Sequence, residues 1–198
     1  MSELHRLVSS ESEELILVDA HDNEIGYRSK ADCHDGSGIL HRAFSLFLFD
    51  ADGELLLQQR AAAKRLWPGF WSNSCCSHPR RGESLQTATM RRLDEELNIA
   101  AELEFVYHFC YQAEFDKTGS ENELCHVFLG KIDGEPQPND SEIESIRFIS
   151  ADDLSAELAA EPQRFTPWFI KEWRALRERS EERRVGKECR CRWAPDHE

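Results

Sequence analysis

Residues 77–99 carry the clearest pattern in this chain, SHPRRGESLQTATMRRLDEELNI. Within it, apolar or small side chains recur at three- and four-residue steps, at Leu85, Ala88, Thr89, Leu93 and Leu97. This spacing predicts an amphipathic helix over 83–97. Asn98 follows it, and asparagine tolerates the left-handed conformation in which many helices end. The segment therefore predicts a loop and then a helix whose free surface is crowded with charge.

Short β-strands are predicted on both sides of this helix. Apolar runs bounded by turn residues indicate strands at 15–19, 43–50, 54–60, 103–114, 123–132 and 143–149. Asp52-Gly53 predicts a β-hairpin of 43–50 with 54–60, and residues 30–39 are typical of a loop. Further helices are expected at 151–158 and 166–177. The interleaved elements favour an α/β (α+β) fold with a mixed β-sheet packed between helices and an N-terminal extension.

Length and charge narrow the choice of partner. The chain has 198 residues, with 24 Lys and Arg against 38 Asp and Glu, a net charge of −14. This balance argues against nucleic acid or an anionic membrane as the main partner, and no apolar run is long enough for a membrane span. The first thirty residues show neither a signal core nor a transit pattern, so we expect a cytoplasmic protein, either monomer or homodimer.

The last twenty residues, 179–198, break the pattern. They concentrate arginine, lack apolar periodicity, and look like the translation of a common sequencing-adapter DNA. We therefore expect a single domain over 1–178 and a non-native, disordered tail over 179–198. The alternative is a natural basic tail.

The segment from Ser77 to Ile99 resembles the Nudix box, whose pattern is G-x5-E-x7-R-E-U-x-E-E-x-G-U with U aliphatic. Three positions depart from it: Ser77 for the first Gly, Arg92 for the first Glu of the R-E pair, and Asn98 for the last Gly. In Nudix hydrolases the carboxylates of this helix hold a divalent metal against a diphosphate, and hard oxygen ligands suit Mg²⁺. Arg92 therefore argues against hydrolysis. Taken singly, each of these charges is better explained by a solvated helix with an Arg91–Glu95 pair.

A second motif, Cys76-Ser77-His78-Pro79, lies directly at the start of this box. The combination resembles the type I isopentenyl-diphosphate isomerase family, in which the Nudix fold performs an alkene isomerisation. Further landmarks of that family match Lys30, His34, His41, Arg60, Lys64, Tyr111, Glu121, Glu123 and Trp168. The resemblance implies a Nudix fold and the interconversion of isopentenyl and dimethylallyl diphosphate in isoprenoid biosynthesis.

The family's reaction protonates an unactivated double bond and removes a proton from the allylic carbon, so it requires an acid and a base on opposite faces of the carbon skeleton. By position, the resemblance assigns these roles to Cys76 and Glu123, and Tyr111 would hydrogen-bond the acid. Thiols are readily tuned towards neutral pH beside metal or cationic groups. Which group is the acid in the forward direction stays open, because the reaction is reversible. The motif requires no thiol at Cys75, which we expect to be structural.

The resemblance also implies two metal sites. One comprises His34, His41, His78, Glu121 and Glu123, a donor set that favours Mn²⁺ or Zn²⁺ over Ca²⁺. The other would hold Mg²⁺, together with the diphosphate, through Glu96 and the backbone carbonyl of Cys76. A metal on Glu123 would orient that carboxyl group and set its acidity. His108 and His126 match no ligand position.

Basic residues are expected at the diphosphate. Lys30, Arg60 and Lys64 match the family's basic positions, and Arg80 and Arg81 lie near the same loop. Trp168 matches an aromatic residue placed near the carbon skeleton, where its π face would stabilise positive charge. The simpler alternatives are a solvated strand end for Arg60 and Lys64, and core packing for Trp168.

Two other functions remain as alternatives to an isomerase. The first is a Nudix pyrophosphohydrolase of a nucleoside-diphosphate derivative, which does not need the Cys, His and E-x-E residues. The second is a catalytically inactive metal-binding module, which would not need the complete set of catalytic residues. In each case the expected ligand is a small molecule or a metal ion rather than nucleic acid.

Overall fold

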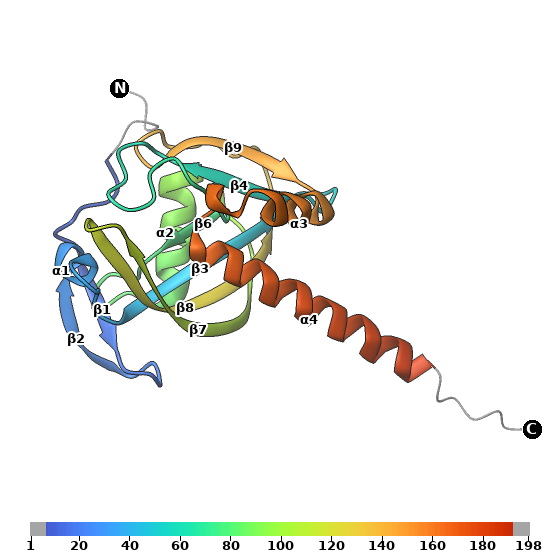
Figure 1. Ribbon diagram of the computed structural model, residues 1–198, viewed down its shortest axis with the longest axis horizontal. Coiled ribbons are helices and arrows are strands. Elements are labelled where there is room, and N and C mark those ends of the chain that lie inside the picture. The colour runs from blue at the N-terminus through green and yellow to red at the C-terminus, as the bar shows by residue number, and fades with distance from the viewer. Residues whose placement is uncertain (1–6, 192–198) are drawn as a thin grey trace, which may run out of the picture.

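The computed structural model describes residues 7–191, with side chains described as far as residue 180. One mixed sheet runs through the molecule, and helices cover both of its faces (Figure 1). The strands are β1 Glu14–Val18, β2 Glu24–Ser29, β3 His41–Phe49, β4 Leu55–Arg60, β5 Trp71–Ser72, β6 Cys75–Ser77, β7 Leu103–Phe115, β8 Gly119–Lys131 and β9 Ile143–Ile149. The helices are α1 Lys30–His34, α2 Leu85–Leu97, α3 Ala151–Ala160 and α4 Pro167–Cys191.

Strand β3 is the centre of the sheet. It pairs in parallel with β8, from His41 opposite Glu123 to Phe49 opposite Lys131. Its other edge pairs antiparallel with β6. Strand β8 in turn pairs antiparallel with β7 along almost its whole length. A parallel pair inside a largely antiparallel sheet confirms the expected mixed sheet.

The prediction of a β-hairpin formed by 43–50 and 54–60 is correct for the turn but wrong for the pairing of the two strands. The turn forms with Gly53 at φ +81°, but β3 and β4 pair only at Phe49 and Leu55. Because β6 and β8 occupy the two edges of β3, β4 diverges and pairs with β9 instead, from Leu55 opposite Ile149 to Arg60 opposite Ile143.

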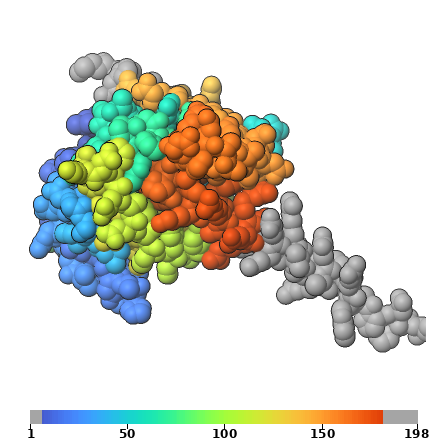
Figure 2. Space-filling model, in the orientation of Figure 1, coloured from blue at the N-terminus to red at the C-terminus, as the bar shows by residue number. Residues whose placement is uncertain are grey.

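The two faces of β3 contribute to separate cores, since successive strand residues point to opposite faces. On one face α2 packs against the strand through Ala88, Leu93 and Leu97, which meet Phe44, Leu46 and Leu48. On the other face α3 and α4 cover Ala43 and Phe47. Figure 2 shows the outer surface of this second layer, where the orange residues of α3 and α4 adjoin the yellow-green strands β7 and β8. The sheet therefore lies between helices, as expected.

Helix α2 confirms the helix predicted from its periodicity. The Ser84 side chain caps its first turn by accepting a hydrogen bond from the backbone N–H of Thr87. Asn98 ends the helix at φ +53°, in the left-handed region. The cap holds α2 directly after the loop that carries His78.

The loop expected for 30–39 is partly helical. Residues Lys30–His34 form α1, because the Ser29 side chain accepts from the N–H of Asp32 and begins a turn. Strand β2, which the sequence patterns did not indicate, pairs with β1. Together they place Lys30 and His34 beside the sheet.

The last helix begins at Pro167, close to the expected start, but continues to Cys191 and extends away from the body of the fold (Figure 1). The backbone of 179–191 is thus helical where disorder was expected, and residues 192–198 lie outside the described residues. Whether 179–198 belongs to the native protein stays a prediction. Among the described helices, none is both long and apolar enough to cross a membrane.

Candidate functional site

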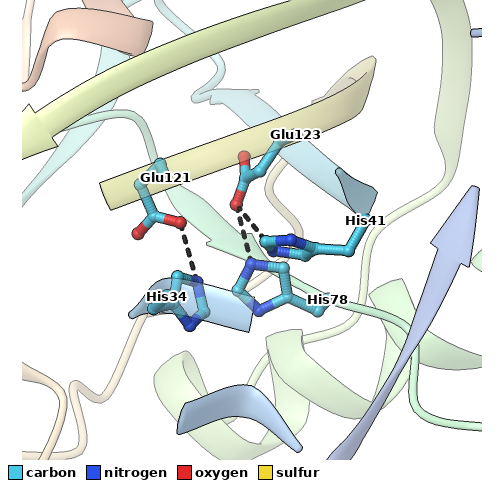
Figure 3. Close-up of side chains that lie close together, drawn as sticks. All are labelled: His34, His41, His78, Glu121 and Glu123. Carbon is cyan, nitrogen blue, oxygen red and sulfur yellow. Dashed lines mark hydrogen bonds and ion pairs between the residues drawn. The ribbon is translucent and has the colours of Figure 1, made fainter. Parts of the chain in front are cut away.

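Five predicted ligands come together at one end of β3. His34, His41, His78, Glu121 and Glu123 each offer a ligand atom, and these atoms all lie within 4.8 Å of one another (Figure 3). They come from the end of α1, the start of β3, the residue after β6, and β8. The fold thus assembles a donor set from four separate segments, each of which is anchored to the same sheet.

Hydrogen bonds at the far side of two imidazoles direct their other nitrogen into this cluster. His34 Nδ1 lies 2.7 Å from the carbonyl oxygen of Lys30, and His41 Nδ1 lies 2.7 Å from that of Ile39. A carbonyl can only accept, so Nδ1 carries the proton and Nε2 presents a lone pair. His41 Nε2 is buried without a hydrogen-bond partner, and the neighbour of the buried His34 Nε2 is the carboxylate of Glu121. Metal-ligating histidines typically have this arrangement.

The carboxylates complete the cluster. Glu121 Oε2 lies 2.8 Å from His34 Nε2, while Glu123 Oε1 lies 2.7 Å from His78 Nε2 and 3.7 Å from His41 Nε2. Buried lone pairs that face one another at these distances repel unless a proton or a cation lies between them. The donor set therefore fits a divalent cation.

Burial keeps two of the imidazoles neutral. It lowers the pKa of His41 to about 4 and that of His78 well below its usual range. Burial also lowers the pKa of His34, but the Glu121 carboxylate outweighs it, so the net shift is upward. Neutral imidazole is the form that binds metal.

Cys76 and Glu123 lie on the two strands that flank β3. Cys76 is opposite Ser45 and Glu123 is opposite His41, so both side chains point to the face of the sheet that α4 covers. Burial raises the pKa of Glu123 well above its usual range, and the neighbouring Glu121 raises it further. Burial raises the pKa of the Cys76 thiol to about 12, although Arg60 opposes the shift. The protein groups alone therefore keep the thiol neutral rather than tuned towards neutral pH.

A cavity of about 290 Å³ joins these groups to the predicted basic residues. Its walls include most of the predicted site residues, namely Lys30, His34, Arg60, Lys64, Cys76, His78, Tyr111, Glu121, Glu123 and Trp168. Two predicted site residues do not line it: His41, which belongs to the cluster, and Glu96, which is buried on α2. The size suits a small molecule with one charged end.

Three of the cations that line the cavity have partners within the protein. Lys64 pairs with Glu142, and Lys30 Nζ lies 2.5 Å from Ser9 Oγ. The guanidinium group of Arg60 donates to the backbone oxygens of Leu66 and Trp67 and stacks 5.4 Å from the ring centre of Trp168. Arg60 thus joins the basic residues of the cavity to the aromatic residue Trp168.

Arg80 and Arg81 do not line this cavity. Arg80 pairs with Glu13 at 2.5 Å and donates to the backbone oxygen of Val8, while Arg81 pairs with Glu14 at 3.2 Å. Both arginines therefore fix the N-terminal segment rather than face the predicted diphosphate position.

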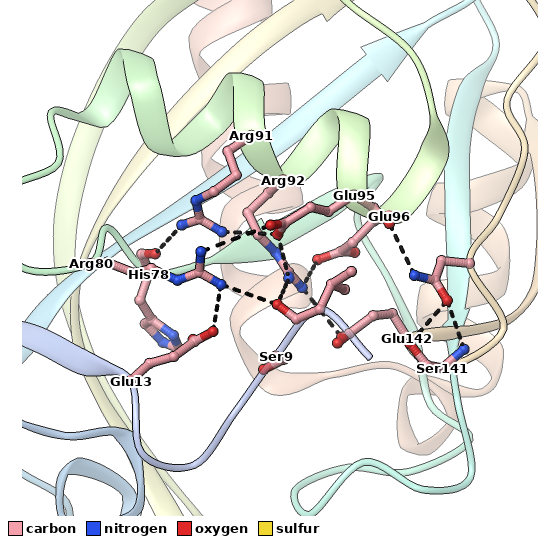
Figure 4. Close-up of polar contacts among 12 residues, drawn as sticks. Ser9, Glu13, His78, Arg80, Arg91, Arg92, Glu95, Glu96, Ser141 and Glu142 are labelled. Carbon is pink, nitrogen blue, oxygen red and sulfur yellow. Dashed lines mark hydrogen bonds and ion pairs between the residues drawn. The ribbon is translucent and has the colours of Figure 1, made fainter. Parts of the chain in front are cut away.

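Sequence reasoning missed Arg92 as a member of the site. Its side chain is buried, lines the cavity, and contacts Glu95 at 3.1 Å, Glu96, and Glu142 at 3.3 Å (Figure 4). The signal was present, because an arginine replaces a carboxylate of the Nudix box. This replacement removes a metal ligand from the motif, and it also adds a positive charge to the site.

The proposed Mg²⁺ ligand Glu96 has protein partners of its own. Its carboxylate pairs with Arg92 and accepts from Gln58 Nε2 at 3.4 Å. The Arg91–Glu95 pair expected for a solvated helix is also present, at 3.0 Å. Glu96 is therefore less free to bind a metal than the His/Glu cluster. Cys75 packs into the core under α2, away from the cavity, as expected of a structural residue.

Comparisons with known proteins agree with this geometry. Residues 39–169 match the NUDIX domain. Among solved structures, DR0079 of Deinococcus radiodurans superposes with a TM-score of 0.68 at 23% identity, covering 82% of this chain and 98% of that protein. A MutT protein of Methanosarcina mazei gives a TM-score of 0.59 at 16% identity, covering 71% of this chain and 95% of that protein. These likenesses confirm the fold: the chain is a member of the NUDIX domain family.

Curated relatives narrow the family further. The isopentenyl-diphosphate Delta-isomerase of Serratia proteamaculans is 48% identical over 158 residues, covering 80% of this chain and 88% of the relative. Isopentenyl-diphosphate Delta-isomerase 1 of Photorhabdus laumondii is 44% identical over 163 residues, covering 81% and 93%. Within the NUDIX proteins, the chain therefore belongs to the isopentenyl-diphosphate Delta-isomerases.

Proposed function

We propose that this protein interconverts isopentenyl diphosphate and dimethylallyl diphosphate, a step of isoprenoid biosynthesis. The observation that carries the proposal is the position of Cys76 and Glu123, which line one cavity from the two strands that flank β3. Each group can exchange a proton, and neither needs an external base. The names of the curated relatives support the choice of substrate.

The proton transfers balance within this pair. One group gives a proton to the terminal CH₂ of isopentenyl diphosphate, which leaves positive charge on the tertiary carbon. The other group removes a proton from the adjacent CH₂, and the double bond forms there. Cys76 and Glu123 exchange the roles of acid and base between the two directions. The buried side chains Glu123, Tyr111 and Trp168 line this part of the cavity, so they limit the access of water to the charged carbon.

Trp168 and Tyr111 support the carbon end of the substrate. Trp168 lines the cavity from α4, and its indole face is suited to stabilise the positive carbon. Tyr111 donates a hydrogen bond of 2.6 Å to Glu123 Oε2, which fixes the direction of that carboxyl group.

The diphosphate end would contact Lys30, Arg60, Lys64 and Arg92. Glu142 contacts both Lys64 and Arg92, so it holds two of these cations side by side. Four local cations offset the repulsion that a chain of net charge −14 exerts on an anionic substrate.

We assign two metal sites to the enzyme. His34, His41, His78, Glu121 and Glu123 would hold Mn²⁺ or Zn²⁺, and their ligand atoms, which all lie within 4.8 Å of one another, support this set. Glu96 and the backbone carbonyl of Cys76 would hold Mg²⁺ with the diphosphate. When bound, the ions supply positive charge that acidifies Glu123 and neutralises phosphate oxygens.

We further propose a cytoplasmic enzyme that acts as a monomer or homodimer and has a single domain over residues 1–178. Its cysteines 33, 75, 76, 110 and 125 are free, which suits a reducing compartment. The cavity and the two cores are built from described residues that precede 178.

A direct assay separates this function from hydrolysis. Purified protein is incubated with isopentenyl diphosphate, Mg²⁺ and Mn²⁺, and dimethylallyl diphosphate and free phosphate are both measured. We expect isomer without phosphate. Phosphate without isomer would favour the pyrophosphohydrolase, and metal binding with neither product would favour an inactive module.

A further inference from the structure

Glu172 is a buried carboxyl group to which the proposed function gives no role. It lies on α4 one turn after Trp168, and its side chain is fully buried. Oε1 accepts a hydrogen bond from Cys125 Sγ at 3.5 Å, and Oε2 is buried without a partner. Among the side chains described, none forms an ion pair with it. A buried acid without a cation destabilises a fold, so its presence calls for a compensating role.

Its contacts lead to β8, the strand that carries Glu123, and through Cys125 to β3, the strand that lies between Glu123 and Cys76. Cys125 follows Glu123 by two residues on β8, so the two side chains point to the same face. The Cys125 thiol also contacts Ser45 Oγ at 3.4 Å, and Ser45 lies opposite Cys76. Glu172 therefore lies beneath the sheet positions next to Cys76 and Glu123, although it does not line the cavity itself.

The charge of Glu172 acts on both groups. It raises the pKa of Cys76 and that of Glu123, and no other residue of α4 is among the main causes for either. Burial raises the pKa of Glu172 to about 7, and the neighbouring Ser45 on β3 and Cys125 on β8 oppose this shift. From β7, the Tyr107 hydroxyl donates to the main-chain oxygen of Glu172 at 3.4 Å. The carboxyl group is therefore largely ionised at pH 8.

We propose that Glu172 is a positioning residue that holds a fixed negative charge beneath the carbon end of the cavity and stabilises the positive carbon formed during isomerisation. The inference rests on the proposed function. A charge fixed in a dry interior interacts strongly with charge that develops nearby, and the protein need not reorganise when the reaction occurs. Trp168 presents its ring on the same helix, so both groups favour the same charge.

Two diphosphates of matched shape test the proposal. 2-(Dimethylamino)ethyl diphosphate carries a protonated nitrogen where the positive carbon would form, and 3-methylbutyl diphosphate is its neutral counterpart. Affinities for both are measured by calorimetry at pH 8 with Mg²⁺ and Mn²⁺, for the wild type, Glu172→Gln and Glu178→Gln. Glu178 is exposed on the same helix and is the matched control.

The wild type and Glu178→Gln should prefer the ammonium compound. Glu172→Gln should lose about tenfold in affinity for it and less than about twofold for the neutral compound. Its kcat should fall about tenfold with KM nearly unchanged, since the interaction forms only as positive charge develops. Glu172→Leu, which is also uncharged and suits the apolar surroundings, gives the same comparison if the Gln variant fails to fold.

An equal change for both compounds, or no change for either, would overturn the role of Glu172. A wild type that isomerises but shows no preference for the ammonium compound would overturn it as well. A wild type that does not isomerise isopentenyl diphosphate would instead refute the proposed function, so the two failures are distinguishable.

Discussion

Tyr111 lies directly opposite Glu123 on the neighbouring strand and donates a hydrogen bond of 2.6 Å to Oε2 of its carboxyl group. The other oxygen, Oε1, lies 2.7 Å from Nε2 of His78. Each oxygen of Glu123 therefore has its own partner, from β7 on one side and from the loop before α2 on the other. The fold fixes the orientation of this carboxyl group before any substrate arrives.

Tyr111→Phe removes one of these two partners. We expect kcat to fall by about 10- to 100-fold while KM changes less than about twofold, because the carboxyl group loses its fixed direction but the basic residues are intact. Steady-state kinetics on isopentenyl diphosphate provide the measurement. Tyr27→Phe is the control, since Tyr27 pairs with Glu24 on β2. Equal kinetics in the two variants would show that the hydrogen bond does not matter.

Substitution of the two adjacent cysteines, Cys75 and Cys76, should have very different effects on activity. Cys76→Ala should lower kcat by about a thousandfold or more, because it removes a proton-transfer group. Cys75→Ala should retain activity and lose about 1 kcal/mol of stability, since it leaves a small void in the core under α2. Activity and urea unfolding are measured for both. A similar loss of activity in the two variants would contradict the assigned roles.

Removal of metal should inactivate the enzyme. Treatment with a chelator followed by gel filtration should abolish isomerisation, and Mn²⁺ or Zn²⁺ together with Mg²⁺ should restore it. His41→Ala should reduce the bound metal measured by mass spectrometry, whereas His108→Ala, outside the cluster, should not. Full activity in protein shown to be free of metal would refute the His/Glu site.

Glu142 should make the free energy of unfolding depend on pH. Burial raises its pKa, but Lys64 and Arg92 outweigh burial and lower the pKa from 4.5 to about 2. Because the pKa is lower in the folded protein than in the unfolded chain, the ionised carboxylate stabilises the fold above about pH 4.5. This contribution to the free energy of unfolding is lost as the pH falls towards 2. The shift corresponds to at most about 3 kcal/mol.

Urea unfolding at pH 7 and at pH 3 measures this contribution. Glu142→Gln should be less stable than the wild type at pH 7 and should approach it at pH 3. Glu144→Gln, exposed on β9, is the control and should follow the wild type at both pH values. An equal deficit of Glu142→Gln at the two pH values would contradict the ion pairing.

The segment after residue 180 should be dispensable. Both cores and the cavity are built from residues that precede it, and the last described contact, Arg179 over the Tyr107 ring at 4.6 Å, is retained in a chain ending at 180. We expect unchanged activity and thermal midpoint for that truncated chain. A loss of either would show that 181–198 contributes to the protein. Sequencing of the gene from genomic DNA would test its origin independently.

Local patterns predicted α2, because periodicity and capping are properties of short segments, whereas the candidate site residues came from motifs shared with a known family. The pairing of β4 was not predictable in this way. Asp52-Gly53 indicates a turn, but whether two strands stay paired depends on what else occupies their edges. Strands β6 and β8 come from distant parts of the chain, and only the folded structure shows that they take both edges of β3.

Arg92 and Glu172 show the same limit within the site. Arg92 was visible as a departure from the motif, but its partner Glu142 lies fifty residues further along and belongs to no motif. Glu172 has neither a motif nor an unusual neighbour in sequence. Its significance arises from burial against Cys125 and Ser45, which only the packing of α4 on the sheet creates.

Isomerisation in D₂O tests the central claim most directly. If Cys76 and Glu123 transfer protons to and from carbon, dimethylallyl diphosphate formed by the wild type with Mg²⁺ and Mn²⁺ should carry deuterium in its methyl groups, as followed by NMR. Cys76→Ala should form no such product. Release of inorganic phosphate without deuterated isomer, or deuterated isomer formed equally well by Cys76→Ala, would contradict the account.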